Sequence, residues 1–258
     1  MLVRTWNLFH GNSVPPGRRA FLDDMLRLAT ADDPDVLCVQ EVPAWALPRF
    51  TVGDVASRPP LGATAGRLLT AANHGVLRSA VSGQGNAIRL APRLRLLAHR
   101  AEALNPTWFR RVEAKRLGLG AVSRLAWARE RRVMQAVRAQ LPDGRTLAVT
   151  NLHCTSYETD PRLADAELLR AARFACDVAF GDEPVVLAGD FNLRAGASAA
   201  LRELTGPAWG FSAPGPGIDH ILVRGLEAGE PVVWPEERRR LQDGTLVSDH
   251  APVEVELG

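Results

Sequence analysis

Residues Val185-Val-Leu-Ala-Gly-Asp-Phe-Asn192 join a short apolar run to two polar side chains. A run of this length between turn-forming residues is typical of a buried β-strand. Asp190 and Asn192 therefore stand where the strand ends. A single Asp or Asn at such a position is most often a turn former that bonds to nearby backbone, so the stretch gains meaning only from its repetition elsewhere in the chain.

Polar or ionisable residues also stand at the ends of five further strand-like segments. These segments are Leu2–Phe9, Asp35–Gln40, Thr146–His153, Ile218–Val223 and Pro252–Leu257. The residues at or beside their ends are Asn7, Glu41, His153, Asp219, Asp249 and His250. A lone histidine beside an apolar strand is usually structural, but repeated placement of chemically matched residues argues for a common site. If the strands belong to packed sheets, their ends can meet in one cleft.

Helical patterns alternate with these strands. The expected helices run from about Gly17 to Ala31, from Asp160-Pro161 to about Phe180, and over Ser198–Leu204. Proline suits the first turn of a helix and aspartate suits its cap, which supports the start at Asp160. The interleaving of strands and helices predicts an α/β fold.

Hairpin patterns indicate that the sheets are mixed. Residues 64–104 predict short extended segments, with turn signals at Asn73-His-Gly75 and Gly83-Gln-Gly85. Pro142-Asp-Gly-Arg145 predicts a hairpin, because Asp-Gly accepts the positive φ of tight turns. Frequent hairpins favour an α/β sandwich of mixed sheets over a purely parallel sheet.

The charge of the chain is nearly balanced but unevenly distributed. Its 258 residues carry 31 Lys+Arg and 29 Asp+Glu, a formal charge of +2. The segment at about 105–132 holds eight basic side chains and two acidic ones. No linker or repeat interrupts the chain, so we expect a single domain over residues 1–258 in which this basic segment is an insertion.

Three observations exclude classes of protein. The three cysteines have no CxxC spacing and are too few for a disulfide scaffold. The first residues hold no apolar core of signal-peptide length, and no stretch of about 18 apolar residues occurs. We therefore expect a cytoplasmic, monomeric protein without membrane insertion.

The residues at the strand ends suit metal-assisted phosphoryl chemistry. Carboxylate and carboxamide oxygens are ligands for hard divalent ions such as Mg²⁺, and no Cys/His cluster favours zinc. In-line attack on phosphorus requires an activated water and neutralisation of the phosphate charge. Glu41 can hold the metal, Asp190 with Asn192 can orient or deprotonate water, and a histidine can stabilise the phosphate.

Seven stretches resemble the endonuclease/exonuclease/phosphatase superfamily, with its deoxyribonuclease I-like fold. They are Thr5-Trp-Asn7, Asp35-Val-Leu-Cys-Val-Gln-Glu41, Gly85-Asn-Ala-Ile88, Asn151-Leu-His153, Gly189-Asp-Phe-Asn192, Ile218-Asp219 and Ser248-Asp-His250-Ala-Pro252. They occur in the order of the superfamily and span residues 5–252. The resemblance implies a four-layer α/β sandwich, in which two mixed, mainly antiparallel sheets pack face to face with helices outside.

The resemblance also implies a role for each residue at the site. Glu41 would be the principal metal ligand for Mg²⁺ or Mn²⁺, completed by Asn7 and Asp249. Catalysis would fall to five residues: His153, Asp190, Asn192, Asp219 and His250. His250 would contact the scissile phosphate while paired with Asp219, and His153 would assist the leaving group. His153 matches the deoxyribonuclease and sphingomyelinase branches, since abasic-site endonucleases generally lack this histidine.

One departure concerns the orientation of His153. In the deoxyribonuclease branch a glutamate orients the second histidine, whereas Ser82-Gly-Gln-Gly-Asn86 contains no acid. Gln84 or Asn86 can substitute, or His153 is less strongly polarised. Asn86 also belongs to a matched stretch, so we expect it among the substrate-binding residues.

The basic segment is the only sequence feature that points to a substrate. Arg110, Arg111, Arg131 and Arg132 are the expected phosphate contacts, with Trp108, Phe109 and Trp127 able to stack on bases. The alternative is an insertion packed on the domain, with Arg131 or Arg132 merely opening a strand. A lipid substrate would favour an exposed apolar hairpin, which the sequence does not indicate.

The first hypothesis is therefore a divalent-metal-dependent phosphodiesterase that acts as a nuclease on DNA or RNA. A second is a phosphomonoesterase, or a phosphodiesterase for lipid headgroups or small molecules, using the same site. A third is a catalytically silent nucleic-acid-binding module, which would not need the complete set of strand-end residues.

Overall fold

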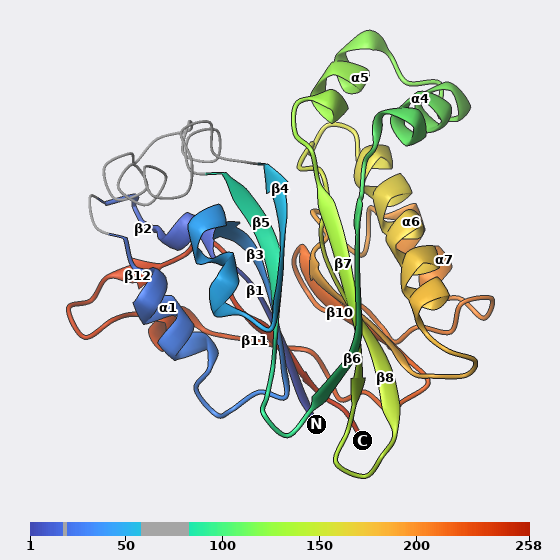
Figure 1. The fold of residues 1–258 in the computed structure, drawn as a ribbon. Coiled ribbons are helices and arrows are strands. Elements are labelled where there is room, and N and C mark those ends of the chain that lie inside the picture. The colour runs from blue at the N-terminus through green and yellow to red at the C-terminus, as the bar shows by residue number, and fades with distance from the viewer. Residues whose placement is uncertain (18–19, 58–82) are drawn as a thin grey trace.

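In a computed structural model of the chain, residues 1–17, 20–57 and 83–258 are described, and they form two facing β-sheets with helices outside (Figure 1). The first sheet has the order β11 (Val232–Val233), β13 (Val253–Glu256), β1 (Leu2–Asn7), β3 (Val36–Pro43), β5 (Gln84–Leu90), β4 (Val52–Ser57). The second has the order β10 (Asp219–Arg224), β9 (Val185–Asp190), β8 (Thr146–His153), β7 (Val133–Gln140), β6 (Arg95–Ala103). A small third sheet pairs β2 (Ser13–Val14) with β12 (Leu246–Val247).

The two main sheets are mixed, as the sequence predicts. β1 runs parallel to β3, and β8 runs parallel to β9. The other neighbours in these two sheets pair antiparallel. The predicted α/β sandwich of mixed, mainly antiparallel sheets is confirmed. Because parallel strands end at the same edge of a sheet, the polar residues after them are brought to one side of the molecule.

The core between the sheets is built from β-branched and other aliphatic side chains. Val3 and Ile88 of the first sheet share one buried cluster with Val149 and Val186 of the second. Side chains on the opposite face of each sheet pack under helices, as expected from the two-residue period of a strand. α1 (Leu22–Ala29) covers the first sheet, and α6 (Arg162–Val178) with α7 (Ala199–Leu204) covers the second.

Several predicted boundaries shift by a few residues. The first helix begins at Leu22 and ends at Ala29, because the chain turns at Asp32 and Asp33, which both have positive φ. Of the extended segments expected over residues 64–104, β5 and β6 are present. The Asn73-His-Gly75 turn and Ser82 lie outside the described residues. Within the described ranges, three 3₁₀ turns are also present: Phe9–Gly11, Ala44–Arg49 and Glu236–Arg239.

The basic segment forms a helical hairpin between β6 and β7. Its helices are α4 (Thr107–Arg116) and α5 (Ala121–Ala128), at the top of Figure 1. Phe109 and Trp127 pack against Leu163 of α6 in a separate buried cluster. The Trp127 indole N–H donates to Glu167 Oε1 at 2.6 Å. The insertion is therefore packed on the domain along its inner side.

The outer side of the same hairpin exposes apolar side chains. Trp108, Val112, Val122 and Leu125 are 60%, 59%, 72% and 75% exposed. The sequence did not indicate this exposed apolar surface. Helical periodicity places apolar residues on both sides of a hairpin, and the sequence does not show which side packs.

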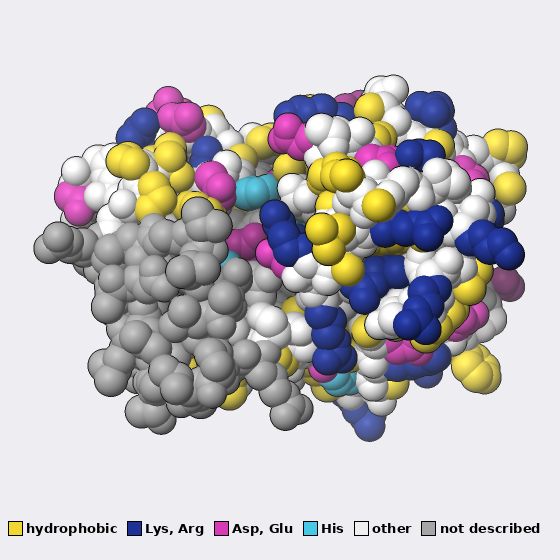
Figure 2. Space-filling model, turned by 90° about the horizontal axis from the view of Figure 1, so that it is seen from above, with side chains coloured by type: hydrophobic (Ala, Val, Ile, Leu, Met, Phe, Trp, Pro, Cys, Tyr) yellow, Lys and Arg dark blue, Asp and Glu magenta, His cyan; other side chains and the backbone are white. Residues whose placement is uncertain are grey.

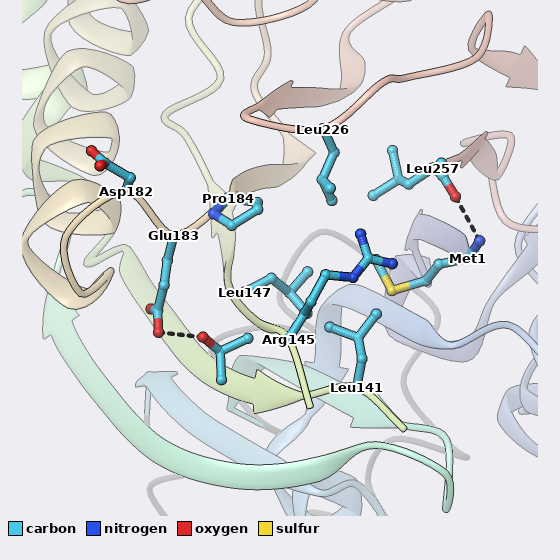
Figure 3. A pocket seen from close by; sticks show the side chains of 11 residues that line it. Met1, Leu141, Arg145, Leu147, Asp182, Glu183, Pro184, Leu226 and Leu257 are labelled. Carbon is cyan, nitrogen blue, oxygen red and sulfur yellow. Dashed lines mark hydrogen bonds between the residues drawn. The ribbon is translucent and has the colours of Figure 1, made fainter. Parts of the chain in front are cut away.

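An apolar cavity of about 430 Å³ opens at the end of the sandwich where β1, β8 and β9 begin (Figure 3). Leu141, Leu147, Leu226 and Leu257 line it, with the Arg145 side chain among them. The six residues of β1 span about 20 Å at roughly 3.3 Å per residue. This cavity is therefore about a strand's length from the opposite strand ends. Among the described residues, no helix is long and apolar enough to cross a membrane.

Candidate active site

The strand register brings the polar residues of the second sheet together. His153 stands opposite Asp190 in the parallel β8–β9 pair, and Asp190 stands opposite Asp219 in the antiparallel β9–β10 pair. Asn7, at the end of β1, donates from Nδ2 to Asp190 Oδ2 at 2.9 Å and so joins the first sheet to the second. The site therefore lies across the gap between the two sheets.

The Asp190 carboxylate is at the centre of this site. Its Oδ2 atom lies 2.9 Å from Asn7 Nδ2, 3.3 Å from His153 Nε2 and 3.8 Å from His250 Nε2. Its Oδ1 atom accepts from the backbone N–H of Asn192 at 3.0 Å. Burial, followed by the charge of Asp219, raises the pKa of Asp190 to about 7. A carboxyl group with a pKa near neutrality can exchange protons with a reacting water.

His250 is held as an imidazolium by Asp219. His250 Nδ1 lies 2.7 Å from Asp219 Oδ2. Burial alone would lower the pKa of His250, but the hydrogen bond and charge of Asp219 outweigh it and raise that pKa to about 10. At neutral pH the ring therefore presents a positive charge and an Nε2–H donor next to Asp190.

The backbone around His250 is fixed by residues to which the sequence analysis assigned no role. The Trp6 indole and Arg239 Nη1 both donate to the His250 carbonyl, at 2.9 Å and 3.0 Å. Arg239 Nη1 also donates to the Ser248 carbonyl at 2.9 Å. Ser248 Oγ in turn donates to the Asn7 carbonyl at 2.7 Å, so the loop that carries His250 is tied to the end of β1.

His153 is contacted by an arginine, where the deoxyribonuclease branch would use a glutamate. Arg132 Nη1 lies 3.0 Å from His153 Nδ1 and 3.1 Å from Nε2. Burial, and then the charge of Arg132, hold the pKa of His153 well below its ordinary value, so the ring is neutral. Asn86 instead donates to the Val133 carbonyl at 2.9 Å. The open question of what positions His153 is answered by Arg132 and Asp190.

Glu41 projects from an irregular point of β3. The β3–β5 register shifts between Val39 and Val42, and Glu41 has a φ of 51°. Its Oε2 atom lies 3.1 Å from His10 Nε2. Burial would raise the pKa of Glu41, but the charge and hydrogen bond of His10, together with the charge of Arg132, lower it far below its ordinary value. Glu41 is therefore an ionised carboxylate at this edge of the molecule.

His10 is another functional candidate that the sequence reasoning missed. It lies in the 3₁₀ turn directly after β1, has a φ of 53°, and is buried. A lone histidine in a turn has no periodic pattern around it, so only the three-dimensional structure reveals its contact with Glu41.

Two groups of side chains have the chemistry to hold a cation. The first group is Glu41 and Asp249, and Glu41 offers ionised oxygen atoms. Partial desolvation and the charge of Glu41 raise the pKa of Asp249, against the opposing effect of His250. In the part of the chain that the structure describes, Asp190, Asp219 and His250 also bring ligand atoms within 4.8 Å of one another. In this second group the charged His250 ring has no free lone pair while it is bonded to Asp219.

The remaining predicted residues lie in three different places. Asn192 has a φ of 51° and donates from Nδ2 to the Cys154 carbonyl at 3.0 Å, beside the site. Arg132 is buried against His153 and pairs with Glu130 at 2.8 Å. Arg110 and Arg111 lie on α4, and Arg131 is exposed before β7. The site thus gathers the predicted strand-end residues, whereas Arg110, Arg111 and Arg131 lie on or beside the helical hairpin.

Two facing mixed sheets thus carry a hydrogen-bonded His–Asp pair and further carboxylates at one edge, an arrangement that suits phosphoester chemistry. Residues 5–250 match the Endonuclease/Exonuclease/phosphatase family, and the chain belongs to this family. Its members are typically metal-dependent phosphoester hydrolases. No curated protein matches the chain.

Several solved structures share the fold. A functionally unknown conserved protein from Enterococcus faecalis V583 is 16% identical, with a TM-score of 0.65 over 100% of this chain and 99% of that one. D. rerio TDP2 complexed with single strand DNA product is 15% identical, with a TM-score of 0.64 over 100% and 98%. The human Nocturnin catalytic domain with bound sulfate is 17% identical, with a TM-score of 0.59 over 100% and 94%.

Proposed function

We propose that this protein is a divalent-metal-dependent phosphodiesterase that hydrolyses nucleic acid. The observation that carries the proposal is the convergence on Asp190 Oδ2 of Asn7, His153 and His250, which come from different strands and loops. The arrangement places a carboxylate, a neutral imidazole and an imidazolium around one point. These are the groups that attack of water on a phosphodiester requires.

The residues of the site fit Mg²⁺ or Mn²⁺. Glu41 is ionised and Asp249 lies close enough for their charges to interact, so the pair offers the oxygen ligands that hard cations prefer. We assign the metal to Glu41 and Asp249, with the side-chain oxygen of Asn7 nearby, rather than to the group that contains the charged His250. The bound cation would supply charge neutralisation to the phosphate oxygens.

The protein side chains divide the remaining work. Asp190 orients the attacking water and accepts its proton, helped by a pKa of about 7. His250 donates a hydrogen bond and positive charge to a non-bridging phosphate oxygen, and Asp219 keeps it charged. His153 is neutral, so it acts on the leaving group or on Asp190 as a hydrogen-bonding group. Asn192 holds Asp190 through its backbone N–H.

Two observations favour nucleic acid over the other phosphoester substrates. The helical hairpin beside the site is rich in arginine, and a basic surface is what a polyanionic strand requires. The structure of D. rerio TDP2, which shares the fold, contains single strand DNA product. Phosphomonoesters and lipid headgroups are the second substrate class. The complete site argues against a silent binding module.

The test is a panel of substrates assayed with Mg²⁺, with Mn²⁺ and with a chelator. We expect metal-dependent cleavage of single-stranded or duplex nucleic acid. Hydrolysis of a phosphomonoester should be slower. Asp190→Ala should abolish cleavage, whereas Asp177→Asn, which changes an exposed carboxylate on α6, should not. Full activity in the chelator, or an Asp190→Ala protein as active as the wild type, would show that the proposed mechanism is wrong.

A further inference from the structure

A pocket lined by three arginines lies between the two helices of the hairpin. It has a volume of about 240 Å³ and is lined by Thr107, Arg110, Arg111, Ala114, Arg124, Trp127 and Ala128. We call it the arginine pocket. Figure 2 looks down on these helices, and Lys and Arg side chains gather on the half of the molecule that carries them.

The arginines of this pocket have no acidic partners in the described part of the chain. Arg110 donates to the Trp127 carbonyl at 3.1 Å and to the Thr107 hydroxyl at 3.3 Å, and Arg124 donates to the Leu119 carbonyl at 2.8 Å. Arg111 makes no hydrogen bond or ion pair with any residue that the structure describes. Three positive charges therefore surround one cavity without neutralisation.

Nearby carboxylates are engaged elsewhere. Glu113 on the same helix bonds Arg116 at 2.6 Å, and Glu130 bonds Arg132 at 2.8 Å. Neither of these acids lines the arginine pocket. An anion entering the pocket would therefore not be repelled by an adjacent acid, and it would gain several charge-assisted hydrogen bonds.

The pocket is held in place by buried contacts that lead to the active site. Trp127 bonds to Glu167, and Glu167 Oε2 accepts from the backbone N–H of Thr155 at 2.6 Å, two residues after His153. Trp127 is also five residues before Arg132, which contacts His153. Five residues of extended chain reach about 18 Å at most. At about 3.4 Å per nucleotide along one strand of a duplex, that distance corresponds to at most roughly five nucleotides.

We propose that the arginine pocket binds a backbone phosphate of a polynucleotide, within a few nucleotides of the scissile phosphate. This inference rests on the proposed function and assigns a second contact to the same substrate. The pocket is smaller than the roughly 300–1,000 Å³ of sites that enclose a whole small ligand, which suits one group of a longer molecule.

An anionic membrane is the competing partner, because the hairpin also exposes Trp108, Val112, Val122 and Leu125. A membrane surface is approached by a convex apolar face with basic residues spread around it. Here the three arginines converge on a concave pocket instead. This convergence favours a single phosphate held in a defined position, and so favours the polynucleotide.

The test is equilibrium binding of a fluorescently labelled single-stranded oligonucleotide in a chelating buffer, where cleavage is suppressed. The variant Arg110→Gln/Arg111→Gln/Arg124→Gln removes the pocket charges. The control variant Arg27→Gln/Arg202→Gln/Arg240→Gln removes the same charge from other surfaces. We expect the Kd to rise at least about tenfold for the pocket variant and less than about twofold for the control, since direct phosphate contacts dominate such binding.

The salt dependence gives an independent readout. Loss of one phosphate contact should reduce the slope of log K against log salt by about 0.7 for a single strand. Equal Kd changes in the pocket and control variants, or an unchanged slope, would overturn the inference. Loss of binding to phosphatidylserine vesicles with unchanged oligonucleotide binding would assign the pocket to a membrane instead.

Two further measurements keep the test decisive. Arg111→Gln alone changes a side chain without hydrogen bonds to the described residues, so it preserves the test if the triple variant does not fold. Hydrolysis of a simple phosphodiester by the wild-type protein with Mg²⁺ tests the proposed function separately. If the wild type hydrolyses it while the pocket variant binds the oligonucleotide normally, only the inference about the arginine pocket fails.

Discussion

The most direct prediction concerns the pair of Asp219 and His250. In the wild-type protein the 2.7 Å contact with Asp219 raises the pKa of His250 to about 10, so the ring is about 99% protonated at pH 8. Asp219→Asn removes the charge while keeping the shape of the side chain. The pKa of His250 should then fall toward its ordinary value of about 6.5, which leaves about 3% of the ring protonated at pH 8.

This change sets the size and the pH dependence of the effect. If catalysis requires the imidazolium, the variant should lose about 30-fold in kcat/KM at pH 8 from protonation alone. At pH 6 about three quarters of the ring is protonated even with a pKa of about 6.5, so the contribution of protonation to the loss should nearly vanish. The variant should therefore recover relative to the wild type as the pH falls.

The assay has two parts. The pKa of His250 is measured by NMR titration of the ring signals in metal-free wild type, Asp219→Asn and the control Asp177→Asn, and kcat/KM is then measured from pH 6 to pH 8. A His250 that still titrates near pH 10 in Asp219→Asn would refute the assigned role of Asp219. A loss of activity that is the same at both pH values would show that Asp219 acts through geometry rather than charge.

Three further predictions concern stability. Gly189 has a φ of 146°, and a Cβ there would lie 1.9 Å from the Leu152 carbonyl oxygen. Gly189→Ala should therefore lower the free energy of unfolding, measured in urea, by about 3 kcal/mol or more. Gly196→Ala, with open space around it, should leave that free energy nearly unchanged. Glu167→Ala should lower the melting temperature strongly, because the Trp127 and Thr155 donors would each lose a buried acceptor, at a cost of about 1–3 kcal/mol each. Trp127→Phe should lower the melting temperature less. Equal melting temperatures for these two variants would contradict the role of Glu167 as a shared acceptor. Hydrogen bonds from Arg138, then Thr146 and the Phe180 amide, lower the pKa of Glu183 to about 2. The resulting stabilisation should be complete above about pH 4.5 and should be lost as the pH falls toward 2, and Glu183→Gln should flatten that part of the stability profile measured by thermal melting.

The strand-end residues could be predicted because their signal is local. The end of a strand such as Val185–Asp190 is visible in the sequence, because the apolar run stops at a polar residue. The two parallel strand pairs bring several such ends to one edge. Fold class and the set around Asp190 therefore follow from pattern and resemblance together. The helix boundaries are less accurate, because caps and positive-φ residues such as Asp32 end helices without changing the hydrophobic period.

The contacts that tune the site could not be predicted in the same way. Arg132 belongs to a run of basic residues that sequence reasoning assigns to substrate, yet its side chain is buried against His153. His10 contacts Glu41 across 31 positions of chain. Arg239 holds the His250 loop through carbonyl oxygens, which every residue possesses. Such contacts depend on how elements meet in space, and no spacing rule records them.

The bond between Trp127 and Glu167 has a consequence for how this protein can be changed. The buried Glu167 carboxylate serves both the hairpin and the loop after His153. A deletion that replaced residues 106–130 by a short linker would thus remove one partner of a carboxylate that also holds the loop after His153. The exposed positions on the outer side of the hairpin, such as Trp108 and Val122, make no hydrogen bond to Glu167. Under the proposed function, substrate preference should therefore be open to engineering by changing the hairpin's surface residues, while the hairpin itself is retained as part of the packed domain.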